Sequence, residues 1–157
     1  MEHPLAGLRI VDTTNNCGEL CGRLLADLGA EVVLIEPSKG SDLRRAAPFS
    51  AGGESLGFLW RNANKSGITL DIASECGNKE FLQLLSEADI WIESGAALGN
   101  TSVSSIAEMF PHLVMTSVTP FGYSGPYSEY VANDDVLEAM SGMMFKAGIA
   151  GKTPLLP

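Results

Sequence analysis

The sequence of 157 residues has little cysteine, little positive charge in its second half and no long apolar run. Its three cysteines, Cys17, Cys21 and Cys76, are too few and too unevenly numbered for a disulfide framework. Cys17 and Cys21 are four residues apart, the spacing of one helix face rather than of a CxxC redox or zinc pair. Because His3 and His112 are the only histidines, the sequence predicts no metal site.

No apolar run approaches the roughly 18 residues that a membrane-spanning helix requires. The N-terminus, Met-Glu-His-Pro, lacks the basic and then apolar segments of a signal peptide. We therefore expect a cytoplasmic protein that does not act at a membrane.

Positive charge is scarce and unevenly placed. The net charge is −9 and the isoelectric point is about 4.6, which argues against a nucleic-acid partner because such binding needs Lys and Arg. Eight of the ten basic residues lie at or before Lys79, whereas residues 80–145 contain nine acidic residues and no Lys or Arg. An anion site must therefore take its cations from the first half of the chain or from its last dozen residues.

The residues that are present indicate a folded domain, since 45% are hydrophobic and only 18% are charged. Short apolar runs alternate with amphipathic stretches. The runs predict strands at 8–12, 31–36, 68–71, 90–92 and 113–118. The stretches predict helices at 18–28, 55–62 and 74–87, one that ends near Met109, and one capped by Asp134 that runs to Ser141. The first helix carries a leucine stripe, and Gly29 is placed to end it: Leu20, Leu24, Leu25 and Leu28.

Alternating strands and helices predict an α/β fold, a Rossmann-like, doubly wound, mostly parallel sheet with helices on both faces. Ligands of such sheets bind at the carboxyl ends of the strands. The segments at those ends are 12–18, 36–45, residue 71, 93–99 and 118–130.

The turn at 13–22 is the first candidate for binding, because small and amide residues there allow backbone N–H groups to meet an anion. Glu36 ends the second strand, where a dinucleotide-binding fold places a ribose-binding acid. The GxGxxG fingerprint is absent, however, and only Gly18 and Gly22 occur. A tight turn with close helix packing explains the same residues, so NAD or FAD binding is only an alternative.

Three other motifs give weaker signals. The stretch 122–126 resembles a nucleophile elbow, but Pro126 replaces the second glycine, and no serine hydrolase is predicted. Asp134 and Asp135 are neighbours, about 100° apart on a helix, and form no catalytic dyad. Residues 62–65 combine two amides and a cation, which suits either a phosphate contact or a solvated turn.

A series of motifs in a fixed order gives the strongest signal. The series includes PLAGLRIVD at 4–12, GRLLADLGAEVVLIEP at 22–37, NANK at 62–65 and SVTPFG at 117–122, with further matches at 40–45, 68–71, 88–93, 125–127 and 139–142. The sequence resembles the class III CoA-transferases, the family of formyl-CoA:oxalate and carnitine CoA-transferases. The resemblance covers nearly the whole chain.

The resemblance implies that residues 1–157 are the N-terminal, CoA-binding part of a Rossmann-like large domain. Full-length members add a small domain and form interlocked homodimers. They move coenzyme A from an acyl-CoA to a free carboxylic acid. In them an aspartate attacks the thioester to give a mixed anhydride, which the CoA thiolate then attacks. That aspartate follows the segment matching 153–157, so we expect it beyond this chain and assign no catalytic residue within it.

The resemblance also implies contacts with CoA, the substrate, in three loops: Asn16, Cys17, Asn64, Lys65, Ser94 and Gly95. At two places the sequence lacks basic residues that the family has. Ser66 replaces the usual Arg after Lys65, and the loop at 94–99 lacks the Arg residues that meet the CoA phosphates in the family. Asn133 stands where the related racemases have a His, which speaks against racemase chemistry.

Two alternatives stay open on the sequence. One is a non-catalytic CoA-binding or assembly domain of a degenerate or fused transferase. The other is an unrelated nucleotide-binding Rossmann domain. Because the family's remaining segments lie outside the chain, we also expect exposed apolar surface and self-association.

Overall fold

The computed structural model describes residues 3–15, 17–95, 98–99, 101–146, 148–149 and 152. The chain divides into two compact units, Met1–Val118 and Thr119–Pro157. The elements of the first unit are β1 (Arg9–Thr13), α1 (Glu19–Asp27), β2 (Glu31–Glu36), the 3-10 helix η1 (Asp42–Arg45), α2 (Leu56–Asn62), β3 (Ser66–Thr69), α3 (Glu75–Ser86), β4 (Ile90–Glu93), α4 (Val103–Met109) and β5 (Val114–Ser117). The second unit contains α5 (Asp134–Ser141) and η2 (Met143–Lys146).

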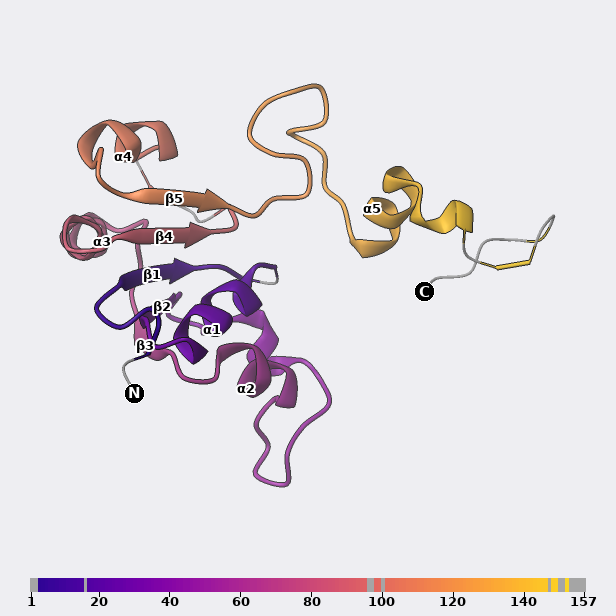
Figure 1. Cartoon of the computed structure of the whole chain (residues 1–157), viewed down its shortest axis with the longest axis horizontal. Coiled ribbons are helices and arrows are strands. Elements are labelled where there is room, and N and C mark those ends of the chain that lie inside the picture. Colours follow the sequence, from indigo (N-terminus) through magenta and orange to yellow (C-terminus); the bar gives the residue numbers. More distant parts are fainter. Residues whose placement is uncertain are drawn as a thin grey trace. The chain divides into compact units, whose positions relative to one another are not determined.

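The five strands form one parallel sheet in the order β3-β2-β1-β4-β5. Figure 1 shows the arrows of β1, β4 and β5 pointing the same way. In the centre of the sheet Val11 lies opposite both Val33 and Trp91. The predicted Rossmann-like parallel fold is thus confirmed.

Helices cover both faces of this sheet. Successive strand residues point to opposite sides, so each strand contributes side chains to both faces. Val11, Ile35 and Trp91 face one core, to which α3 contributes Phe81 and Leu85. A smaller core on the other face joins Ile10, Val32 and Ile92 to Ala26 of α1 and to Ala30. The sheet is therefore doubly wound, as predicted.

Polar caps and one glycine set the helix ends. Ser55, Ser74 and Ser102 each accept a hydrogen bond from a backbone N–H in the first turn of the helix that follows. Gly29 has φ +99° just beyond α1, and its N–H donates to the Ala26 carbonyl at 2.9 Å, so it ends the helix as expected. The cap of α5 was predicted wrongly. Asn133 accepts from Val136 N at 3.1 Å, and Asp134 is the first helical residue.

The third strand also differs from its predicted range of 68–71. Pairing with β2 places it at Ser66–Thr69, with Ser66 opposite Val33 and Thr69 opposite Glu36. The apolar pattern missed the first two positions because Ser66 and Gly67 are exposed and not apolar. The shift frees Leu70 and Asp71 to form a loop at the carboxyl edge of the sheet.

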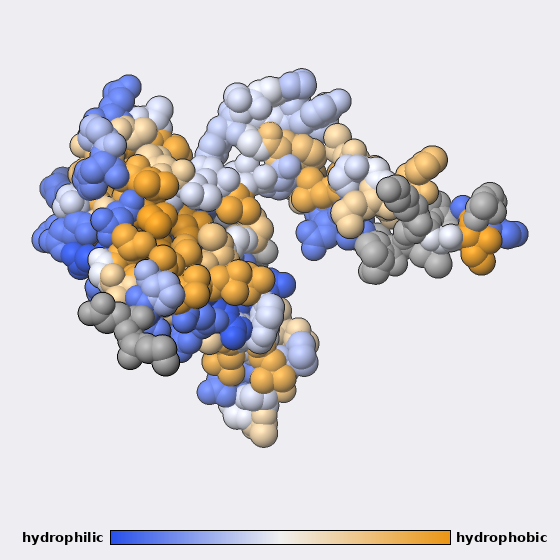
Figure 2. Space-filling model, in the orientation of Figure 1, coloured by the Kyte–Doolittle hydropathy of each residue, from blue (hydrophilic) through white to orange (hydrophobic). Residues whose placement is uncertain are grey.

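Of the predicted leucine stripe, only Leu25 packs against the core of the unit, and the other three leucines are exposed. Leu20, Leu24 and Leu28 are 37%, 54% and 46% exposed, whereas the buried residues of α1 are Glu19, Gly22 and Ala26. Figure 2 shows hydrophobic residues gathered on this side of the sheet, over α1. Exposed apolar surface is thus present on the first unit, and self-association stays a prediction.

The second unit has few regular elements. Ahead of α5, an aromatic group forms from Phe121, Tyr127 and Tyr130, with ring centroids 5.3–6.4 Å apart. No helix in the described part of the chain has both the length and the apolar character to cross a membrane.

Candidate functional site

A pocket of about 380 Å³ opens at the carboxyl edge of the sheet, where the loops after β1, β2, β3 and β4 meet. We call it the strand-end pocket. Its described lining is Thr13, Asn15, Ile35, Glu36, Pro37, Leu70, Asp71, Ile72, Ala73, Ser94 and Gly95. The volume is within the range of about 300–1,000 Å³ that small-molecule sites occupy. The sequence had predicted a binding site at this edge, because ligands of parallel sheets bind at the carboxyl ends of the strands.

Ser94 and Gly95, two of the residues implied by the family resemblance, lie in this lining. Asn15 N donates to Ser94 Oγ at 2.8 Å, and Ser94 Oγ donates to the Asn15 carbonyl at 3.2 Å. Gly95 N donates to the buried carboxylate of Glu93 at 2.7 Å. The two bonds between Asn15 and Ser94 join the loops after β1 and β4. Asn15 was missed as a single residue, although it lies in the turn that the sequence singled out.

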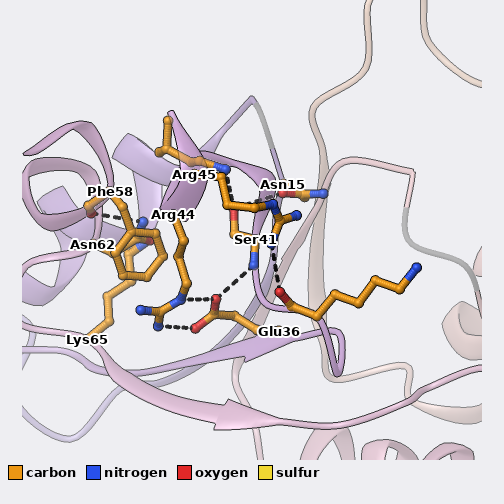
Figure 3. Close-up of polar contacts among 10 residues, drawn as sticks. Asn15, Glu36, Ser41, Arg44, Arg45, Phe58, Asn62 and Lys65 are labelled. Atoms are coloured by element: carbon orange, nitrogen blue, oxygen red, sulfur yellow. Dashed lines mark hydrogen bonds and ion pairs between the residues drawn. The ribbon is translucent and has the colours of Figure 1, made fainter. Parts of the chain in front are cut away.

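Glu36 enters the lining from β2 as a paired carboxylate. Arg44 donates to its two oxygens from Nε and Nη2, each at 2.6 Å, and Ser41 N donates to Oε2 at 2.9 Å (Figure 3). The guanidinium of Arg44 also lies 3.8 Å from the ring centroid of Phe58. Planar, two-point pairing of this kind is among the stronger charged contacts in proteins.

This arrangement affects the charge of both groups. The hydrogen bonds from Arg44 lower the pKa of Glu36 below its usual range, against the opposing effect of burial. The same pairing raises the pKa of Arg44. Glu36 is therefore ionised, and both of its oxygens already accept from the protein. This weakens the interpretation of Glu36 as a ribose-binding acid of a dinucleotide fold.

Lys65 lies in a different place, on the face of the sheet covered by α1. Its Nζ is 2.8 Å from Asp12 Oδ2, and the two side chains are 1% and 0% exposed. The ammonium also donates to the Glu19 carbonyl and to Asn62 Oδ1, each at 2.7 Å, and Figure 3 shows the contact with Asn62. We call Lys65, Asp12, Asn62, Thr14 and the Glu19 carbonyl the Lys65 cluster.

The remaining implied contacts are also away from the pocket. Asn64 has φ +65° and donates to Asp27 Oδ1 at 2.7 Å. Cys17 Sγ donates to the Val118 carbonyl at 3.3 Å. Among the described residues, the pocket lining includes neither of them and does not include Lys65. Asn16 lies outside the described residues.

Charge in the pocket is negative. Its described lining has two acids, Glu36 and Asp71, and no Lys or Arg. The cation nearest along the chain is Lys39, which follows Pro37 in the loop that also carries Arg44 and Arg45. Arg45 is half exposed and pairs with Asp42. No cluster of His, Cys, Asp or Glu suited to a metal occurs among the residues that the structure describes.

Comparison with known proteins identifies the family of the chain. The model of CoA-transferase family III matches residues 5–157. The chain belongs to that family. It is 40% identical to the probable CoA-transferase Rv1866 of Mycobacterium tuberculosis, over 94% of this chain and 20% of that protein. It is 36% identical to the succinyl-CoA:(R)-benzylsuccinate CoA-transferase subunit BbsE of Thauera aromatica, over 99% of this chain and 40% of that subunit.

Solved structures agree with the fold of this CoA-transferase family III chain. A CAIB/BAIF family protein from Brucella suis superposes with a TM-score of 0.90 at 31% identity, covering 100% of this chain and 44% of that one. Rv3272 from Mycobacterium tuberculosis gives 0.86 at 28% identity, covering 99% and 45%. The chain spans between 20% and 40% of the length of the two curated relatives named above.

Proposed function

We propose that this chain is the N-terminal, CoA-binding part of the large domain of a class III CoA-transferase, and that the strand-end pocket receives part of a CoA thioester. The observation that carries the proposal is the place of Ser94 and Gly95. They match a CoA-contact loop of the family and lie beside Asn15 in the pocket. The pocket also combines an apolar group, Ile35, Leu70 and Ile72, with polar atoms at its edge, a composition typical of small-molecule sites.

The phosphates of CoA need positive charge that the described pocket lining lacks. We infer that Lys39 and Arg45, in the loop that starts at the pocket residue Pro37, supply it in place of the Arg residues missing from 94–99. Arg45 Nη1 donates to the Lys39 carbonyl at 2.8 Å, which holds the two residues together. Arg44 has a separate task, since it neutralises Glu36 beside the bound anion.

For the whole protein we propose transfer of CoA from an acyl-CoA to a carboxylic acid in a cytoplasmic homodimer. The carboxylate oxygen of an aspartate, which we expect beyond this chain, forms a bond with the thioester carbon, and the CoA thiolate leaves. The thiolate then attacks the aspartyl carbonyl of the anhydride and releases the original acid. The acceptor acid repeats the two steps in the opposite sense. The named activities of the relatives, such as succinyl-CoA:glutarate CoA-transferase in Homo sapiens, support this proposal.

The experiment that tests the site is calorimetric titration of the 157-residue chain with CoA. Ala73 lines the pocket and is exposed, so Ala73→Trp fills the pocket without disturbing the core. Ala107 on α4 is also exposed and lies outside the described lining, so Ala107→Trp is the matched control. We expect Ala73→Trp to weaken CoA binding by more than about tenfold and the control to leave it unchanged.

A second titration, with NAD, separates the family proposal from an unrelated nucleotide-binding domain. We expect CoA to bind and NAD to give no measurable heat. Tighter binding of NAD than of CoA, or equal CoA binding by both tryptophan variants, would contradict the proposal.

A further inference from the structure

The buried amine of Lys65 has no contact with the strand-end pocket and yet holds the loop from which the pocket is partly built. We propose that Lys65 is a positioning residue that orders the β1–α1 loop through Asp12, and that its ammonium does not touch the ligand. The inference rests on the proposed function, because the pocket that the loop shapes is the one assigned to CoA.

The hydrogen bonds of the ammonium are fully used within the protein. A lysine ammonium has three N–H donors. They go to Asp12 Oδ2 at 2.8 Å, to the Glu19 carbonyl at 2.7 Å and to Asn62 Oδ1 at 2.7 Å. With a side chain that is 1% exposed, Lys65 cannot reach a phosphate without breaking one of these bonds.

Asp12 transmits the effect of Lys65 to the loop. Its second oxygen, Oδ1, accepts from both Thr14 N at 2.9 Å and Thr14 Oγ1 at 2.6 Å. Thr14 stands between Thr13 and Asn15, which both line the pocket. The buried carboxylate of Asp12 thus connects the Lys65 ammonium to Thr14, the neighbour of two pocket residues.

The Lys65 cluster and the strand-end pocket lie on opposite faces of the sheet. Asp12 has the same strand parity as Ile10, which faces the α1 core. Thr13 has the other parity, and its Oγ1 accepts from Trp91 Nε1 at 2.9 Å, within the α3 core. The Lys65 cluster therefore fixes the loop from beneath α1 while the pocket opens on the α3 side.

A glycine makes room for the cluster. A Cβ on Gly22 would lie 2.2 Å from Asp12 Oδ2 and 3.1 Å from Lys65 Cε. Only the absence of a side chain at this position of α1 lets the helix approach the pair so closely. Asn62 and Lys65 of the NANK motif contact each other and buried groups of the protein, so these contacts explain the motif without a ligand.

Lysine reactivity in the wild-type 157-residue chain tests the inference directly. The chain is treated with an acetylating reagent, with and without CoA, and each lysine is followed by peptide mass mapping. We expect Lys65 to react more than about tenfold more slowly than Lys79, whose side chain is 73% exposed, whether or not CoA is present. Fast labelling of Lys65 in the free chain that CoA suppresses would overturn the inference.

Two variants then test the coupling through Asp12. Lys65→Met leaves a buried carboxylate without its cation, and we expect weaker CoA binding by more than about tenfold together with faster amide exchange at Thr14 and Asn15. In Asp12→Asn/Lys65→Met both charges are gone, and the introduced amide oxygen can still accept from Thr14 N. We expect loop protection and CoA affinity to return to within about threefold of wild type.

Each result has a defined meaning. A folded double variant that keeps the full loss of CoA affinity would identify Lys65 as a direct contact and overturn the inference. Unchanged amide exchange in folded Lys65→Met would overturn it as well. If CoA does not bind the wild-type chain, the proposed function fails, whereas the slow labelling of Lys65 and the exchange at Thr14 still decide whether it orders the loop.

Discussion

The two faces of the sheet are buried by different means. On the α3 face, Phe81, Leu85, Trp91 and Ile106 are each 0% exposed and form an apolar core. On the α1 face, the buried side chains include Asp12 and Glu19, and Lys65 is enclosed with them, while Leu20 and Leu24 of α1 are exposed. The α3 face is held by a large apolar core, whereas the α1 face combines a smaller apolar core with a buried charged pair and close packing at Gly22.

The difference between the faces separates two effects: one face mainly stabilises the fold, and the other restricts the conformation of the β1–α1 loop. Apolar burial stabilises without fixing direction, at roughly 25 cal/mol per Å². A buried ion pair contributes little net stability but penalises every arrangement that separates its charges. The face that shapes the β1–α1 loop is the face with the ion pair, which agrees with a positioning role.

A matched pair of leucines gives the largest expected difference between the faces. Leu85→Ala on α3 should lower the free energy of unfolding by about 2–5 kcal/mol, because it opens a cavity in a closed core. Leu24→Ala on α1, at a position 54% exposed, should change it by less than about 0.5 kcal/mol. Urea denaturation of both variants measures the contrast. Equal losses would show that the α1 leucines are buried in solution.

A matched pair of glycines tests the close approach on the α1 face. Gly22→Ala should destabilise by about 1–3 kcal/mol, since the new methyl group meets Asp12 and Lys65. Gly57→Ala in α2, where a Cβ makes only ordinary contacts at 3.5 and 3.7 Å, should be neutral or stabilise by up to about 1 kcal/mol. Thermal unfolding of the two variants decides between them. A neutral Gly22→Ala would contradict the packing described for the Lys65 cluster.

The Glu36–Arg44 pair predicts a smaller, pH-dependent effect. The pKa of Glu36 is lowered in the folded state, so its contribution is complete above the unfolded value of about 4.5 and is lost as pH falls through the lower folded value. Arg44→Met should remove this dependence. The expected change is about 1 kcal/mol or less, because Arg44 is half exposed and water screens the pair.

Unfolding free energies of wild type and Arg44→Met, measured between about pH 3 and 7, test this expectation. The two curves should converge at the acidic end. A constant separation at every pH would show that Arg44 acts through its packing on Phe58 rather than through its charge.

The smallest effect is expected at the surface pair of α3. Lys79 and Glu75 are bonded at 2.7 Å, but their side chains are 73% and 87% exposed. Lys79→Met should therefore change the free energy of unfolding by less than about 0.5 kcal/mol, and high salt should abolish the change. A loss as large as that of Gly22→Ala would mean that exposed ion pairs contribute far more to this fold than usual.

Much of the site was predictable because it depends on local pattern. Strand ends in a parallel sheet meet at one edge, so the segments after β1, β2 and β4 were expected to lie together. Ser94 and Gly95 followed from the family motifs and lie in the pocket. Residue 71 was also expected at this edge and lines the pocket, whereas Ala73 was missed because the apolar pattern ended the third strand two residues too late.

The sequence by itself determined the order of elements, the parallel sheet and the family, because short apolar runs, glycines at helix ends and ordered motifs are local signals. Only the tertiary structure decided which side of α1 is buried and which groups Lys65 contacts. Both depend on the distance between α1 and the end of β1, which Gly22 permits and which the Lys65–Asp12 pair fills. A cation in a motif looks the same in the sequence whether it faces a ligand or a buried carboxylate.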